Sequence, residues 1–200
     1  MDEIVLQGMA RWPNVPSVYG WLSLDRRGTW RLKGEPITHA GLTEFIARNY
    51  ERDGDGRWFF QNGPQRVYVR IEFLPMLVHA QLVGGELQLQ THTRRTIDRV
   101  DGAWLDEQGD LIIGFDGTGG LWRDRDLGLL PDVLVTRSGA AADDGTIERA
   151  LARAGAGLDP EIMLRTGVGP VRVGSIRSDT LAQTFGFVAD PRPAPGEPEC

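Results

Sequence analysis

The chain has 200 residues, of which 40% are hydrophobic and six are Trp, enough to fill a core without disulfide support. Its 22 Lys and Arg are outnumbered by 28 Asp and Glu, so the net charge of −6 gives no general attraction to nucleic acid or to an anionic membrane. The one Cys can form neither an intrachain disulfide nor a thiolate zinc site. No stretch approaches the roughly 20 apolar residues that span a bilayer, and the start is acidic where a signal peptide needs positive charge. We therefore expect a soluble, cytoplasmic protein.

Regular structure is predicted to begin with two short strands, at residues 18–24 and 29–33. The intervening Asp25-Arg26-Arg27-Gly28 supplies a turn, with Gly28 where a positive φ is favoured. Between residues 38 and 52 the apolar period changes from two to about three and a half. This spacing predicts an amphipathic helix that ends at the glycine-rich residues 53–56.

Two further strands are predicted at residues 58–60 and 67–72, joined by a turn at residues 62–64. Because side chains alternate along a strand, one set faces the core and the other faces outward. The inward set is Val67, Val69 and Ile71. The outward set is Arg66, Tyr68, Arg70 and Glu72. The first 75 residues thus form a β-β-α-β-β unit.

From residue 76 the pattern is almost wholly β, with short runs separated by glycine or acidic turns. In residues 87–94 strict alternation places Gln88, Gln90, His92 and Arg94 on one polar face. After residue 137 the composition favours helices, at residues 144–154, from residue 159, and at residues 178–185. Four prolines among the last eleven residues predict a disordered tail.

These elements predict an α+β fold made of repeated small β-rich units. Residues 20–37 form a hairpin-like pattern with alternating side chains, and a weaker copy appears at residues 103–115. We expect two tightly packed subdomains, at residues 1–75 and 76–137. A helix-containing extension at residues 138–189 and a disordered tail at residues 190–200 are expected to follow.

The sequence offers no recognisable catalytic signature. His39, His79 and His92 lack the spacing of metal ligands, and no Ser lies in a Gly-x-Ser-x-Gly elbow. Nine acidic residues between positions 98 and 132 could hold a hard cation, although most flank glycines in tight turns, where Asp is expected for local hydrogen bonding. A carboxylate- or metal-dependent hydrolase is therefore one alternative, and no cofactor or metal site is predicted.

Two polar strand faces provide the one positive indication of a site. Arg66, Tyr68 and Arg70 share the outer face of one predicted strand, and His92 and Arg94 share the polar face of another. If the two strands adjoin, they form a basic, aromatic patch suited to a small anion or an acidic partner. The alternative is an ordinary solvated sheet face.

The first half of the chain resembles a bacterial family of unknown function, the domain of unknown function numbered 1285, or a sister family. The resemblance covers about residues 10–100. It lies in the strand at residues 20–24, Gly28-Thr29-Trp30, Gly34-x-Pro36-Ile37, Leu42 and Phe45, residues 55–59, residues 64–69 and, more weakly, residues 87–93. It implies repeated β-rich motifs in two closely associated halves and a ligand-sensing or signalling role. Gly63 and Gln65 depart from the threonine and glutamate that the family tends to have around the proline.

Together these features favour a non-catalytic ligand-sensing or signalling module that uses Arg66, Tyr68, Arg70, His92 and Arg94. The expected partner is a small molecule or another protein, with a homodimer left open and with nucleic acid and membranes excluded. A purely protein-binding adaptor is a further alternative, favoured if Trp12 or Trp122 lies on an exposed apolar patch.

Overall fold

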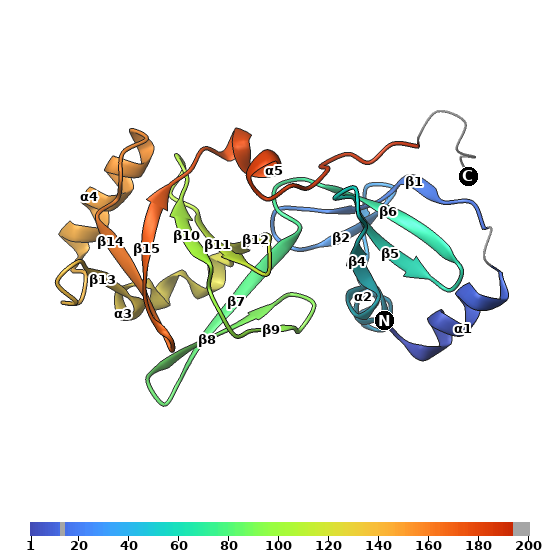
Figure 1. Ribbon diagram of the computed structural model, residues 1–200, viewed down its shortest axis with the longest axis horizontal. Helices are drawn as coiled ribbons and strands as arrows, with labels where there is room; N and C mark the ends of the chain where they lie inside the picture. The colour runs from blue at the N-terminus through green and yellow to red at the C-terminus, as the bar shows by residue number, and fades with distance from the viewer. Residues whose placement is uncertain (13–14, 194–200) are drawn as a thin grey trace. The chain divides into compact units, whose positions relative to one another are not determined.

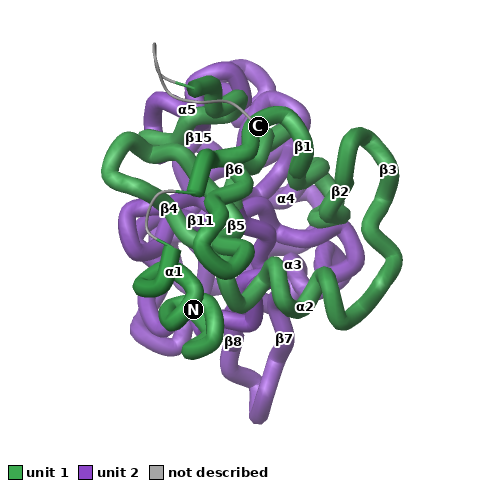
Figure 2. The backbone as a smooth tube through the Cα atoms, turned by 90° about the vertical axis from the view of Figure 1, so that its right-hand side faces the viewer, with its two compact units in different colours: residues 1–75, 186–200 green, residues 76–185 purple. Residues whose placement is uncertain are grey.

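The computed structural model describes residues 1–12 and 15–193, and these divide between two compact units. Unit 1 comprises residues 1–75 together with residues 186–200, and unit 2 comprises residues 76–185 (Figure 2). The model confirms the α+β class, with most of its regular structure in two sheets. No described helix is both long and apolar enough to cross a membrane.

Unit 1 contains a six-stranded sheet in the order β3-β2-β1-β6-β5-β4. Figure 1 labels each of these strands except β3. Its β1 and β6 pair in parallel, and the other neighbours pair antiparallel. In chain order its elements are α1 (Glu3–Arg11), β1 (Val18–Leu24), β2 (Trp30–Leu32), β3 (Glu35–Pro36), α2 (Ala40–Arg48), β4 (Tyr50–Arg52), β5 (Trp58–Asn62) and β6 (Gln65–Ile71).

Unit 2 contains a nine-stranded sheet in the order β13-β14-β15-β10-β11-β12-β7-β8-β9. Its first elements are β7 (Met76–Val83), β8 (Glu86–Thr91), β9 (Thr96–Ile97), β10 (Gly102–Leu105), β11 (Leu111–Phe115) and β12 (Thr118–Trp122). They are followed by η1 (Asp124–Leu129), α3 (Leu130–Val133), β13 (Leu134–Thr136), α4 (Asp144–Gly155), β14 (Ile162–Thr166), β15 (Gly169–Ser175), η2 (Ser178–Thr180) and α5 (Leu181–Thr184).

The two sheets repeat one six-stranded pattern, as the weak copy in the sequence predicts. The order β4-β5-β6-β1-β2-β3 in unit 1 matches β13-β14-β15-β10-β11-β12 in unit 2. Counted along the chain, the first and last strands of each pattern pair in parallel, namely β1 with β6 and β10 with β15. A helix, α2 or α3, directly precedes the fourth strand along the chain, β4 or β13. Unit 2 adds α4 between its fourth and fifth strands and extends the sheet with β7, β8 and β9.

A single turn type joins many of these strands. Asp25, Asp53 and Asp106 each accept two backbone N–H bonds through Oδ1, from the residues two and four positions later. The Gly three positions after each Asp has a positive φ and donates its N–H to the Asp carbonyl. Thr91 and Thr136 begin turns with the same backbone bonds. The same backbone turn thus reverses the chain at five places.

Both faces of the unit 1 sheet are buried at its centre. On one face Ile46 of α2 is 1% exposed, and Phe45 packs edge-on against Phe60 at 5.4 Å. On the other face Tyr19, Phe59 and Tyr68 form a separate buried cluster. The prediction that Tyr68 faces outward into solvent is therefore wrong, since the residue is 2% exposed.

The structure confirms some of the predictions for the region after residue 137 and corrects others. The helices predicted at residues 144–154 and 178–185 are confirmed as α4 and as η2 with α5. The helix predicted from residue 159 is wrong, because Glu161 has a φ of 62° and the chain continues into β14. The expected extension at residues 138–189 does not stand apart. Strands β14 and β15 pair with β13 and β10, so residues 138–185 belong to the same unit as residues 76–137.

The two ends of the chain also bear on the predictions from the sequence. Helix α1 was not predicted from the sequence. The predicted disordered tail begins within the structure, where residues 190–193 have no regular secondary structure, and its remainder at residues 194–200 lies outside the described residues.

Candidate functional site

The structure places the predicted site residues in two different sheets. Arg66, Tyr68 and Arg70 lie on β6 of unit 1, whereas His92 and Arg94 lie in the turn after β8 of unit 2. The strands that were expected to adjoin therefore do not pair.

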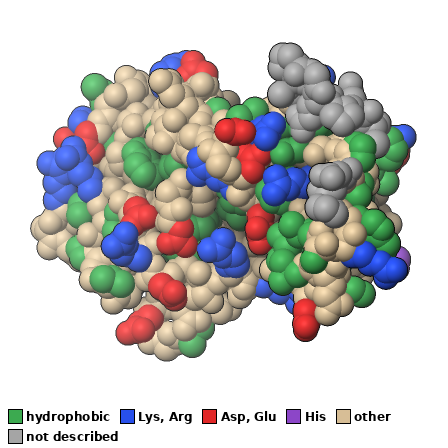
Figure 3. All heavy atoms as spheres, turned by 45° about the vertical axis from the view of Figure 1, so that its right-hand side comes forward, with side chains coloured by type: hydrophobic (Ala, Val, Ile, Leu, Met, Phe, Trp, Pro, Cys, Tyr) green, Lys and Arg blue, Asp and Glu red, His purple; other side chains and the backbone are tan. Residues whose placement is uncertain are grey.

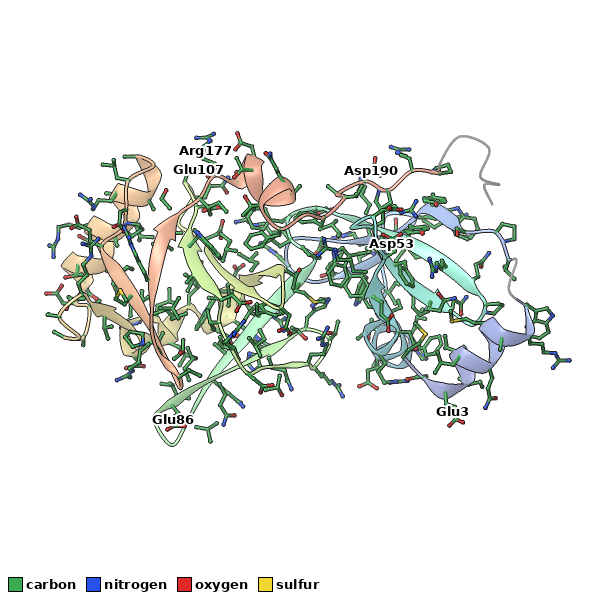
Figure 4. The ribbon with its side chains drawn as sticks, viewed as in Figure 1. Glu3, Asp53, Glu86, Glu107, Arg177 and Asp190 are labelled. Atoms are coloured by element: carbon green, nitrogen blue, oxygen red, sulfur yellow. The ribbon has the colours of Figure 1, made fainter. Side chains whose placement is uncertain are left out.

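Tyr68 is held inside a network of polar and aromatic contacts. Its hydroxyl donates to Oδ2 of Asp53 at 3.1 Å, and its ring stacks on Tyr19 with centroids 4.6 Å apart. The Arg57 guanidinium lies 4.8 Å from the centroid of the Tyr68 ring and donates to Asp53 at 2.8 Å. Burial raises the pKa of Tyr68, and although burial also disfavours the Asp53 carboxylate, hydrogen bonds from Arg57 hold the pKa of Asp53 below its usual range. The network, near Asp53 in Figure 4, supports the fold and leaves Tyr68 little surface for a ligand.

The two arginines on β6 have different surroundings. The Arg66 guanidinium lies over the Phe59 ring, 4.6 Å from its centroid, and no described carboxylate forms an ion pair with it. Arg70 is more exposed and lies 3.9 Å from Glu72. Arg66 is therefore the better placed of the two to receive an anion.

His92 and Arg94 belong to one of the repeated turns. The Nδ1 atom of His92 accepts the N–H of Leu77 at 3.3 Å, which ties the turn to β7. Burial of the imidazole, with a contribution from Arg123, lowers the pKa of His92 to about 3, so the ring is neutral at physiological pH. Arg94 has a φ of 65° and occupies the position that Gly fills in the related turns. Both residues therefore have a structural role in this turn.

A groove of about 350 Å³ opens within unit 1 beside α1 and the β5–β6 hairpin. It is lined by Met9, Trp12, Val15, Ser17, Gln61, Pro64 and Arg66. Helix α1 approaches the hairpin closely at Gly8, where an added Cβ would lie 3.4 Å from both Gly63 and Pro64. A small residue at this helix position thus allows α1 to lie close to the hairpin.

Gln61 gives the groove an unusual polar group. The residue is 1% exposed, and its Nε2 donates to the Gly63 carbonyl at 2.8 Å. Its Oε1 is buried and accepts no hydrogen bond from the described residues. A buried acceptor without a partner costs about 1–3 kcal/mol, so a donor that reaches it is favoured. Nothing in the sequence pattern distinguishes Gln61 or the groove residues of α1, because their proximity arises only from tertiary packing.

The acidic segment between residues 98 and 132 does not gather into a metal site. Within the described part of the chain, no three His, Cys, Asp or Glu side chains are grouped so that they could hold a metal ion. Glu107, seen near Arg177 in Figure 4, instead accepts the N–H of Ser178 at 2.9 Å and the hydroxyl of the same residue. These contacts lower the pKa of Glu107 to about 2. Acidic and basic side chains are also interspersed over the face in Figure 3.

The two aromatic residues proposed for an adaptor surface differ in exposure. Trp122 is 1% exposed and belongs to the core of unit 2. Trp12 is 52% exposed, lies beside the Arg11 guanidinium and lines the groove of unit 1. Its exposure is thus part of the groove already described.

The architecture defines an α+β protein built on two copies of one six-stranded pattern. A family model described as "Protein of unknown function (DUF2946)" and named DUF2944 matches residues 1–192, and the chain belongs to that family. No curated protein matches the chain.

The solved structures that resemble this chain are DUF1285 family proteins, as the sequence resemblance predicts. One, from Silicibacter pomeroyi DSS-3, has a TM-score of 0.53 at 16% identity, with 82% of this chain and 85% of that chain covered. Another, from Shewanella baltica OS155, has a TM-score of 0.43 at 17% identity, with 59% of this chain and 93% of that chain covered. At this identity the first similarity shows a shared fold.

Proposed function

We propose that the protein is a non-catalytic sensor of a small anionic ligand, which binds in the groove of unit 1. The observation that carries the proposal is that Arg66 and Gln61, which each lack one strong polar partner, line the same groove. The Arg66 guanidinium has no ion pair with a described carboxylate, and the buried Oε1 of Gln61 accepts no hydrogen bond from the described residues. A guanidinium and an amide carbonyl can each hydrogen-bond a ligand, and neither group acts as a nucleophile or a base.

The chemistry of the lining indicates the class of ligand. The Arg66 guanidinium has a hydrogen bond with the Tyr68 side chain, and the rest of its five N–H donors can bind a carboxylate or a phosphate. The Oε1 of Gln61 is a hydrogen-bond acceptor that requires an O–H or N–H donor. Met9, Trp12 and Pro64 add apolar surface for the body of the ligand. The groups together suit a compact molecule with one anionic group, one donor and an apolar ring or chain.

A sensing role is supported by the elements that form the groove. Met9 and the half-exposed Trp12 lie at and just beyond the end of α1, whereas Gln61 and Arg66 lie on β5 and β6. A ligand in the groove would therefore contact the helix and the sheet at once. Binding is expected to cover Trp12 and to restrain α1, a change that a partner could read.

The test uses 3-hydroxybenzoate, whose carboxylate suits Arg66 and whose hydroxyl suits Gln61, in isothermal titration calorimetry. We expect saturable binding that weakens at least tenfold in Arg66→Gln. Arg70→Gln is the matched control, because it removes the same charge from the same strand face outside the groove. Equal binding by both variants, or no binding of this probe and of phenyl phosphate to the native chain, would contradict the proposal.

A further inference from the structure

A histidine and an aspartate are locked together in unit 2, outside the groove described above. Nδ1 of His79 on β7 lies 2.6 Å from Oδ2 of Asp126 in η1. The same Oδ2 accepts the backbone N–H of Ala80 at 3.2 Å, and Asp126 is only 8% exposed. The Arg125 guanidinium is 3.7 Å from the other carboxylate oxygen. The carboxylate is therefore surrounded by donors.

This arrangement fixes which nitrogen of His79 carries a proton. A carboxylate only accepts hydrogen bonds, so Nδ1 must be the donor in the 2.6 Å contact. In the neutral ring the other nitrogen, Nε2, then has a free lone pair. The side chain of His79 is 33% exposed, and Nε2 accepts no hydrogen bond from the described residues.

His79 lines a groove of about 320 Å³ on β7, β8 and β9. The floor contains the apolar side chains of Leu89 and Ile97, which are 4% and 8% exposed. Polar side chains surround them. The other lining residues are Gln81, Leu87, Gln88, Gln90, Thr96 and Asp98.

The charges around the groove favour a cation. Asp98 lines it, and no described residue forms an ion pair with this carboxylate. The neighbouring arginines face other acids: Arg99 pairs with Asp101 at 2.8 Å, and Arg95 lies 3.7 Å from Asp116. The groove thus presents one carboxylate and one imidazole lone pair, both acceptors.

From this geometry we propose that the groove is a second ligand site, specific for a small primary amine. The ammonium group donates one N–H to Nε2 of His79 and another to the carboxylate of Asp98. The amide groups of Gln81, Gln88 and Gln90 are available to the remainder of the ligand. Asp126 is a positioning residue that keeps the lone pair of His79 directed at the amine, as carboxylates do for the imidazoles of metal sites and catalytic triads.

Two probes of equal length and opposite charge test the proposal. The intact, ¹⁵N-labelled chain is titrated with 1,4-diaminobutane and, separately, with succinate, and its amide and imidazole resonances are followed by NMR. We expect saturable shifts with the diamine at β7, β8 and β9 and at Nε2 of His79, and none with succinate. Diamine shifts that fall elsewhere, no saturable shift, or equal shifts with succinate would overturn the proposal.

Variants separate a binding role from a structural one. Asp98→Asn is expected to weaken diamine binding at least tenfold, while Asp101→Asn, which removes an acid outside the groove, leaves it unchanged. Asp126→Ala removes the acceptor that holds the proton of neutral His79 on Nδ1. The tautomer with the proton on Nε2 is then expected to become populated, which is visible in the ¹⁵N shifts of the ring, and diamine binding is expected to weaken in a folded chain. Equal affinity in the Asp98 and Asp101 variants would overturn the proposal. The outcome does not depend on 3-hydroxybenzoate binding, since the two sites use different units and ligands of opposite charge.

Discussion

At the scale of single residues, the repeated Asp turns explain how a chain rich in short strands directs them. The Asp side chain satisfies two N–H groups that the tight turn would leave without partners, and the following Gly allows the positive φ. Asp53 is further stabilised as an anion by Arg57, whereas burial and the nearby Asp110 raise the pKa of Asp106. The two turns share a geometry, but the surroundings favour the charged form of Asp53 and disfavour the charged form of Asp106.

A pair of substitutions at Asp106 tests this interpretation. Asp106→Asn keeps an acceptor for both N–H groups and removes a charge that burial disfavours, so the free energy of unfolding should change by less than about 1 kcal/mol. Asp106→Ala leaves both donors without a partner and should cost about 1–3 kcal/mol. Urea unfolding at neutral pH measures both values. An Asn variant as unstable as the Ala variant would show that the charge itself is needed.

The buried ring of His92 predicts a pH dependence of stability. Its pKa is about 3 in the folded chain and about 6.5 in an unfolded one, so the unfolded chain binds the extra proton between these values. The contribution is complete above about pH 6.5 and is lost as the pH falls toward 3, by up to about 1.4 kcal/mol per pH unit. Urea unfolding of the native chain and of His92→Asn between pH 7 and 5 checks this. The native chain should lose stability more steeply, and parallel curves would rule out His92 as the cause.

At the scale of elements, glycines make room for one large ring in the unit 2 sheet. Trp104 on β10 lies so close to Gly102, Gly114 and Gly174 that an added Cβ would meet its ring at 2.4, 2.8 and 3.0 Å, respectively. Phe185 packs edge-on against the same indole at 5.6 Å. The glycines of β10, β11 and β15 thus serve packing, in addition to any effect on backbone conformation.

Gly114→Ala is expected to force Trp104 out of this position, because a Cβ at 2.8 Å cannot be accommodated unless the ring moves. Overpacking of this kind costs about 1–3 kcal/mol. Thermal unfolding measures the loss. Gly128→Ala is the matched control, since no atom lies within 4 Å of its added Cβ. Equal stability of the two variants would contradict the packing role.

The elements that could be predicted from sequence are those with a clear local period. The alternation in β6 and β8 and the apolar stripe of α4 each identify one element correctly, because regularly spaced apolar side chains of each element meet the core. Strand β14 was mistaken for a helix because Asp159-Pro160 resembles a helix start, whereas the positive φ of Glu161 is not visible in the sequence. The burial of Tyr68 was missed because its polar neighbours suggested an exposed face.

The candidate site was less predictable than the fold. Arg66 was identified from strand alternation, and it does line a groove. Gln61 and Ser17 were not identified, and Trp12 was named only for an adaptor surface, because the convergence of these residues depends on how α1 packs against the β5–β6 hairpin. The His79–Asp126 pair joins residues 47 positions apart and has no spacing that a motif could record.

At the scale of the whole molecule, unit 1 is assembled from both ends of the chain. Residues 186–189 bind it through three hydrogen bonds that join Arg52 to the Gly186 carbonyl, Val188 to the Gly56 carbonyl and Ile71 to the Ala189 carbonyl. Unit 2, in contrast, is one continuous segment.

Removal of the C-terminal segment should therefore affect the two units unequally. A chain that ends at Phe185 loses all three hydrogen bonds, and amides of β4 to β6 should exchange with solvent faster while those of β10 to β15 stay protected. Hydrogen exchange with mass spectrometry resolves the two regions. A chain that ends at residue 193 retains the bonds and serves as the control. Uniformly faster exchange in both units would contradict this division.

The central claim is that the groove of unit 1 holds a small anion between Arg66 and Gln61. The most direct measurement is a titration of the ¹⁵N-labelled chain with 3-hydroxybenzoate, observed at the Gln61 side-chain amide, the Arg66 Nε–H and the Trp12 indole N–H. We predict saturable shifts of all three resonances with one common dissociation constant, and their loss in Arg66→Gln. Shifts confined to other residues, or three resonances that remain unchanged at a saturating concentration, would contradict the account.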